Sequence, residues 1–149
     1  MSPPLSPEPS PTQVPEHAPA HTFGISYLAV AGSVARGRRA VRAFAEAEGA
    51  TPAVLDDITL ASSEAITNVV QHAYPGAEGE VHVSARARSR RLCIAVVDHG
   101  RGLAHVTPRP GLGRGLDVMR HVSHEMALES RLGGGVEVRL GFDLGERAP

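Results

Sequence analysis

The sequence has no tryptophan, a single cysteine and few aromatic side chains. Aromatic residues make up 3% of its 149 residues, while hydrophobic residues make up 42%. The core must therefore be built from Leu, Val, Ile and Ala, and it is large enough for one ordinary domain. The lone Cys93 excludes an intramolecular disulfide framework and fits a reducing cytoplasm. Because it lies in an apolar strand segment, Cys93 is expected to be an inert core residue.

The chain also lacks a strong net charge and any long apolar run. Its formal charge is -1 at pH 7, which gives no indication of a nucleic-acid partner. No basic-then-apolar signal sequence opens the chain, and no apolar run is long enough to span a bilayer. These absences predict a soluble cytoplasmic protein that binds neither nucleic acid nor membrane directly.

The composition divides the chain into a tail and one domain. Residues 1–20 are rich in Pro and Ser and have almost no apolar side chains, which predicts a disordered tail. A partner-docking arm is the alternative for this segment. Residues 21–145 are expected to form the domain, and residues 146–149 a short C-terminal tail.

Hydrophobic patterning predicts five strands and three helices in the domain. The strands are expected over residues 22–30, 80–87, 92–98, 125–130 and 136–144. The helices are expected over residues 34–48, from Thr51 to the stop at Pro75–Gly76, and over 115–122. The basic turn 88–91 and the glycines 133–135 would each close a hairpin. The pattern indicates the α+β class, a two-layer sandwich with a mixed, mostly antiparallel sheet and helices on one face.

Capping signals mark the helix ends. Ser33 is the expected N-cap of the first helix, and Gly49 is its expected C-terminal glycine. Thr51 is the expected N-cap of the second helix, with Pro52 at the first helical position.

The second helix carries the first motif with chemical potential. Glu64, Asn68 and His72 are spaced four residues apart, so they share one helix face beside the apolar stripe. The amide oxygen of Asn68 can hold a hydrated Mg²⁺, while the Glu64 carboxylate stays free to take a proton. Mg²⁺ needs few protein ligands when phosphates supply the rest. The alternative is an ordinary solvated helix face.

The second motif follows an apolar strand. Asp98 ends that strand, and Gly100 and Gly102 alternate after it. A carboxylate at this position can accept from the exocyclic amine of adenine and would repel the O6 oxygen of guanine. The glycines let a flat ligand approach the backbone. The alternative is an Asp in a β-turn with glycines at positive φ.

The third motif is a glycine run that leads into a helix. Gly111, Gly113 and Gly115 precede an amphipathic segment, where bare N–H groups and the positive end of a helix dipole form a phosphate cradle. The spacing matches neither a Walker A nor a Rossmann fingerprint. Arg114 lies inside the run and is a candidate for contact with a γ-phosphate. The alternative is a flexible loop before a helix.

In this order, the three motifs resemble the N, G1 and G2 boxes of the GHKL superfamily. That superfamily includes histidine-kinase catalytic domains, type II topoisomerase ATPase subunits and MutL-type repair ATPases. The closer resemblance is to the RsbW-like anti-sigma-factor serine kinases. The run Ser-Glu-Ala-Ile-Thr-Asn-Val-Val-Gln-His-Ala-Tyr-Pro at residues 63–75 is typical of that branch, as is the very short segment between the second and third motifs. The resemblance covers residues 23–144 and implies a Bergerat-type fold.

The resemblance also implies a role for each motif residue. Glu64 would be the general base, and Asn68 would be the Mg²⁺ ligand. Asp98 would bind the adenine amine with help from Gly102, and Gly100 would line the same contact. The phosphates would be bound by Gly111, Gly113 and Gly115.

One position departs from the family pattern. The family often has a Gly-Thr pair at the start of the last strand, where the Thr supports the adenine contact. Here the pair is Gly135–Val136. The missing hydroxyl implies weaker adenine binding or compensation by water.

The implied activity is that of an ATP- and Mg²⁺-dependent serine/threonine kinase. Its partners would be a STAS-domain anti-anti-sigma protein, which it phosphorylates, and a sigma factor, which it sequesters. A homodimer is possible. One alternative is a nucleotide-dependent switch that binds a partner without useful phosphotransfer, and another is a detached histidine-kinase domain. The presence of Glu64 favours the enzyme, because a pure binding module needs no base there.

Overall fold

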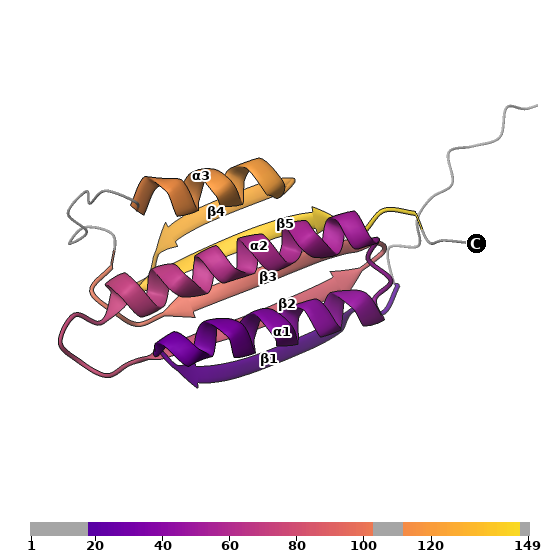
Figure 1. Cartoon of the computed structure of the whole chain (residues 1–149). Helices are drawn as coiled ribbons and strands as arrows, with labels where there is room; N and C mark the ends of the chain where they lie inside the picture. The colour runs from indigo at the N-terminus through magenta and orange to yellow at the C-terminus, as the bar shows by residue number, and fades with distance from the viewer. Residues whose placement is uncertain (1–17, 103–111, 147–149) are drawn as a thin grey trace, which may run out of the picture.

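The computed structural model describes residues 18–102 and 112–146. Within them, five strands form one sheet in the order β1-β2-β3-β5-β4, and the α-helices cover one face of it (Figure 1). The elements are β1 (His21–Leu28), α1 (Ala31–Ala47), α2 (Pro52–Asn68), the π-helical turn η1 (Val69–Ala73), β2 (Glu80–Arg88), β3 (Arg91–Asp98), α3 (Leu112–Val122), β4 (Glu125–Ser130) and β5 (Val136–Asp143). This two-layer arrangement confirms the predicted α+β class.

The sheet is antiparallel at every pairing of the described strands. The expected mixed character is therefore absent from this part of the chain. The reason lies in the crossover through α3, which leaves β3 and β4 running in the same direction. These two strands do not pair, because β5 lies between them and runs antiparallel to both.

The core lies between the helices and the inner face of the sheet, and it is almost wholly aliphatic, as predicted. Alternate residues of β2 and β3 point inward and are buried, as a strand period of two requires. The largest fully buried side chains include Phe142, Ile58, Ile66, Leu92 and Ile94.

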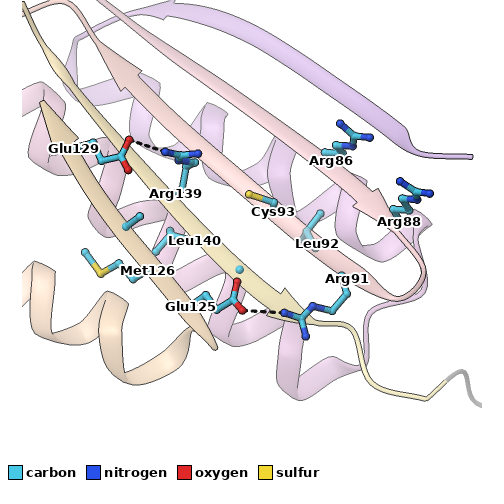
Figure 2. Close-up of a pocket in the computed structure, with 12 residues that line it drawn as sticks. Arg86, Arg88, Arg91, Leu92, Cys93, Glu125, Met126, Glu129, Arg139 and Leu140 are labelled. Carbon is cyan, nitrogen blue, oxygen red and sulfur yellow. Dashed lines mark hydrogen bonds and ion pairs between the residues drawn. The ribbon is translucent and has the colours of Figure 1, made fainter. Parts of the chain in front are cut away.

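Cys93 is not a core residue, contrary to the expectation. It is exposed on the outer face of β3 (Figure 2). Leu92 and Ile94 occupy the inward positions on either side of it. The period of two therefore assigns Cys93 to the face that no helix covers.

The predicted capping was partly wrong. α1 begins at Ala31, so Ser33 lies inside the helix, where its buried hydroxyl donates to the carbonyl of Leu28. Ser33 thus ties the helix to the end of β1. Thr51 is the N-cap of α2 as predicted, but its side chain makes no capping hydrogen bond. Gly49 follows α1 with a φ of 82°, as expected for a C-terminal glycine.

The hairpin turn between β2 and β3 ties three parts of the fold together. Arg90 has a φ of 64° in this turn. Its guanidinium donates to the carbonyls of Glu48, Gly49, Leu144 and Gly145 at 2.8–3.0 Å. The end of α1 and the end of β5 leave these carbonyls without partners in regular structure, so one side chain satisfies both ends.

Replacing Arg90 by Met should lower the free energy of unfolding by about 1.5–3 kcal/mol, because hydrogen bonds to a charged donor are lost and their acceptors remain half-buried. Urea unfolding followed by circular dichroism measures this. Arg86→Met is the matched control, since Arg86 is exposed on the outer face of β2 (Figure 2). Equal stability of the two variants would show that the Arg90 contacts contribute nothing.

Candidate functional site

The side chains of the first motif lie between α2 and α3. Proline at the first helical position and a buried apolar stripe fix α2 on the sheet. Glu64 and Asn68 lie beside that stripe and are partly buried. A methyl group on Gly115 would lie 3.0 Å from Glu64 Oε2 and 3.3 Å from Asn68 Oδ1. The structure therefore brings Glu64, Asn68 and the first turns of α3 together.

The predicted start of α3 was too late. The helix begins at Leu112, so Gly113, Arg114 and Gly115 lie within its first turns rather than in a preceding loop. Gly113 and Arg114 are exposed there. The first N–H groups of a helix have no partners within it. Gly111 lies outside the described residues.

The second motif lies at the end of β3. Asp98 is 5% exposed, and its Oδ1 accepts from the amide of Gly100 at 2.9 Å. Among the described residues, the other carboxylate oxygen accepts no hydrogen bond. A methyl group on Gly100 would lie 2.2 Å from the carbonyl oxygen of Ala73. Gly100 therefore lets the segment after β3 pass directly against the end of the first motif.

The end of the α2–η1 helix is attached to this segment by several hydrogen bonds. The amide of Arg101 donates to Ala73 O at 3.0 Å, and its Nε donates to His72 O at 2.9 Å. The Tyr74 hydroxyl accepts from the amide of His99 at 2.9 Å and donates to Glu80 O at 2.6 Å. The end of α2, the end of β3 and the start of α3 meet on the left of Figure 1.

A cavity of about 80 Å³ lies between these elements. Asn68, His72, Asp98 and Gly102 line it together with Arg101. Its remaining walls are mainly aliphatic and include Val69, Val96, Leu116, Leu128 and Val138. Ligand pockets usually enclose about 300–1,000 Å³. The cavity alone is therefore smaller than an ordinary ligand pocket.

The glycines before β5 also belong to this site. Gly133, Gly134 and Gly135 have φ values of 85°, 109° and 98°. A methyl group on Gly135 would lie 2.0 Å from the carbonyl oxygen of Asp98, and one on Gly134 would lie 3.5 Å from that of Gly100. The sequence predicted these glycines as a hairpin turn, and the family resemblance related the Gly135–Val136 pair to the adenine contact. Their packing against the end of β3 had no local signal.

A larger hollow, of about 530 Å³, lies on the uncovered face of the sheet. Figure 2 shows its arginines and the ion pairs Arg91–Glu125, at 3.2 Å, and Arg139–Glu129, at 2.6 Å. The hydrogen bond that Arg139 donates to the Glu129 carboxylate raises the pKa of Arg139 above its usual value. None of the three motifs reaches this face, so size alone does not make it the functional site.

Comparison with known proteins identifies the family. The sequence model of the histidine kinase-like ATPase domain matches residues 28–142. The chain belongs to the histidine kinase-like ATPase family. The anti-sigma F factor of Clostridium acetobutylicum is 31% identical over 125 aligned positions, and the match covers 76% of this chain and 87% of that protein. That of Pasteuria penetrans is 34% identical over 116 positions, covering 69% of this chain and 77% of that protein. These relatives confirm the predicted branch.

A solved structure shares the fold of this histidine kinase-like ATPase domain. The RsbU and RsbW domains of a Mycobacterium tuberculosis protein match with a TM-score of 0.67 and 23% identity. The match covers 86% of this chain and 34% of that one, so the chain spans about a third of the solved protein's length.

Two features of this ATPase domain bear on its ligands. In the described part of the chain, no three His, Cys, Asp or Glu side chains group as metal ligands. A cation at Asn68 would therefore depend on phosphates and water for its other ligands, which suits Mg²⁺. Val136 lines the cavity at the position where the family often has Thr.

No helix of residues 18–102 or 112–146 is both long and apolar enough to cross a membrane.

The glycines before β5 allow a test of the packing at the site. Gly133→Ala should lower the free energy of unfolding by about 1–3 kcal/mol, the cost of an unfavourable φ alone. Gly135→Ala should lower it by more than about 3 kcal/mol, because the methyl group also meets the backbone of β3. Chemical unfolding of both variants measures the difference. Indistinguishable losses would mean that β3 and the turn are not packed as described.

Proposed function

We propose that this protein is an ATP- and Mg²⁺-dependent serine/threonine kinase of the anti-sigma type. It transfers the γ-phosphoryl group of ATP to a Ser or Thr of a STAS-domain anti-anti-sigma partner, and it sequesters a sigma factor. The observation that carries this proposal is the placement of Glu64 and Asn68 against the first turns of α3, beside a cavity that Asp98 lines. The names of the anti-sigma F relatives support it.

Adenine would occupy the cavity. Its flat ring would lie between the aliphatic walls contributed by α2 and by the sheet. Asp98 keeps one carboxylate oxygen without a hydrogen bond among the described residues, and that oxygen would accept from the adenine amine. Gly100 and Gly102 would allow the ring to approach the backbone, and Val136 would contribute an apolar contact in place of a hydroxyl.

The phosphates would lie at the start of α3. The free N–H groups near Gly113 and Gly115 and the positive end of the helix dipole favour anions there. Arg114 would contact the γ-phosphate, and Gly111 is proposed to belong to the same cradle. Asn68 would hold the Mg²⁺, which supplies charge neutralisation for the phosphates when it is bound.

Glu64 would act as the general base. Its carboxylate would take the proton of the partner's hydroxyl as that oxygen forms its bond to the γ-phosphorus. The bond between the γ-phosphorus and the bridging oxygen breaks, and ADP leaves. Positioning and charge stabilisation supply most of the acceleration in such reactions. The base therefore contributes a part of the rate rather than all of it.

The sigma factor is proposed from the names of the anti-sigma F relatives, and the STAS-domain partner from the resemblance of the motifs to the family. The sigma factor, the STAS-domain protein, the homodimer and the cytoplasmic location stay predictions. Affinity capture from the native host with and without ATP, followed by mapping of phosphorylated residues in the captured proteins, tests the partners directly. A captured sigma factor together with a phosphorylated STAS protein is the expected result.

Nucleotide selectivity tests the role of Asp98. ATP with Mg²⁺ at about a hundred times its Kd should add roughly 2.7 kcal/mol to the free energy of unfolding, and GTP should add much less. Thermal unfolding measures both. Asp98→Asn should reduce the difference between the stabilisation by ATP and that by GTP, because the amide can also donate to guanine O6. Equal stabilisation of the unaltered protein by ATP and GTP would remove the adenine-reading role.

The kinase activity depends on Glu64. Glu64→Gln should leave the fold and most of the ATP affinity intact, since the amide is nearly isosteric. It should slow phosphotransfer to the captured partner by about 10²–10⁴-fold, the usual contribution of a positioned base. Single-turnover transfer from labelled ATP at saturating nucleotide measures this.

Glu46→Gln is the matched control for that experiment, because Glu46 is exposed on α1. An unchanged rate in Glu64→Gln would mean that Glu64 is not the base. No transfer by the unaltered protein to any bound partner would instead favour the nucleotide-dependent switch.

A further inference from the structure

Arg101 lies between Gly100 and Gly102, the two glycines of the second motif. Among the described residues it is the only arginine in the wall of the cavity, which it shares with Asp98 and Gly102. Most of the other walls are aliphatic, and Arg101 is the one guanidinium beside the polar side chains of Asn68, His72 and Asp98.

The position of Arg101 is set by two carbonyls at the end of the π-helical turn η1. Its amide donates to Ala73 O at 3.0 Å and its Nε to His72 O at 2.9 Å. The last carbonyls of a helix have no partner within it, so these two are available as acceptors. The backbone and the side chain of Arg101 are both held in place. Binding of a ligand to Arg101 would therefore cost little conformational entropy of this side chain.

The rest of the guanidinium is available to a ligand. An arginine has five N–H donors, and only the one on Nε is engaged within the described residues. The group is planar and weakly hydrated, and it stacks readily on aromatic rings. Arg101 is half-buried and lines the cavity, so a ligand there would displace water from its side chain.

The location of Arg101 indicates which part of a bound nucleotide it would contact, the adenine or the phosphates. Its Nε binds the carbonyl of His72, which lies one helical turn beyond Asn68 and two beyond Glu64. Gly115, at the phosphate end, packs against Glu64 and Asn68 instead. Arg101 also lies three residues after Asp98, the proposed reader of the adenine amine. Arg101 therefore lies at the end of the site where adenine is proposed to bind.

We propose that the guanidinium of Arg101 stacks on the face of the bound adenine ring. This inference rests on the proposed ATP binding and assigns a second protein contact to the base. A contact with the ring face is tolerant of base identity, because every base has a π face. Arg101 thus contributes affinity for purines in general, while Asp98 contributes selectivity for adenine.

The test compares ligands that contain the base with one that lacks it. Arg101→Met keeps the length of the side chain but removes the planar cation. Calorimetric titration of the full chain with adenosine, ATP and inorganic triphosphate should show about 2- to 30-fold weaker binding of adenosine and ATP, the range of a cation–π contact. Binding of inorganic triphosphate should be unchanged. The affinity for GTP should fall by the same factor as that for ATP.

Three outcomes would overturn the proposal. Weaker binding of ATP and triphosphate with unchanged adenosine binding would make Arg101 a phosphate ligand. An equal loss for all three ligands would reduce it to an anchor of η1. Unchanged binding of every ligand would leave it without a role. If the unaltered protein bound neither adenosine nor ATP, the proposed ATP binding would fail as well.

Two further variants keep the test interpretable. Arg120→Met removes an exposed arginine from the far end of α3 and should change none of the affinities. Arg101→Lys keeps the charge but lacks the planar group, and it should recover only part of the adenosine affinity. Far-UV circular dichroism of each unliganded variant shows whether it is folded, and Arg101→Lys replaces Arg101→Met if the latter is not.

Discussion

The site depends on three stretches of backbone that pack without side chains between them. The end of the α2–η1 helix meets the segment after β3 at Gly100, and the turn before β5 meets the end of β3 at Gly135. A methyl group at either position would lie within 2.2 Å of a carbonyl oxygen. Cores tolerate changed side chains by repacking, but backbone contacts of this kind have no such freedom. The relative placement of Asp98 and the α2 helix follows from this constraint.

Local chemistry in the sequence predicted most of the fold. Strand alternation located all five strands, and the Thr51–Pro52 pair marked the start of α2. The errors have tertiary causes. Ser33 resembles a cap, but its hydroxyl reaches the carbonyl of Leu28 instead. Cys93 lies in an apolar run and is nevertheless exposed. Helices cover one face of the sheet, and the apolar run does not indicate which of its residues point to that face.

The motif residues of α2 and β3 were predictable because a fixed helix period and a strand end bring them to one region. Arg101 was not, since a single arginine in a glycine run is also typical of an exposed turn. Its hydrogen bonds join residues nearly thirty positions apart in the chain, and no local pattern indicates such a pairing. The packing of the glycines before β5 was also not predictable. The sequence indicated a turn there, but it did not indicate that this turn packs against the end of β3.

The order of the strands bears on how the protein is made. β5 is the last strand in the chain, yet it lies inside the sheet and separates β3 from β4. Val136 and Val138, which line the cavity, belong to it. While the chain is being synthesised, β3 and β4 therefore lack the strand that joins them until β5 has left the ribosome. The cavity lined by Asp98 is completed only then, and the newly made chain exposes an unpaired β3 edge until that point.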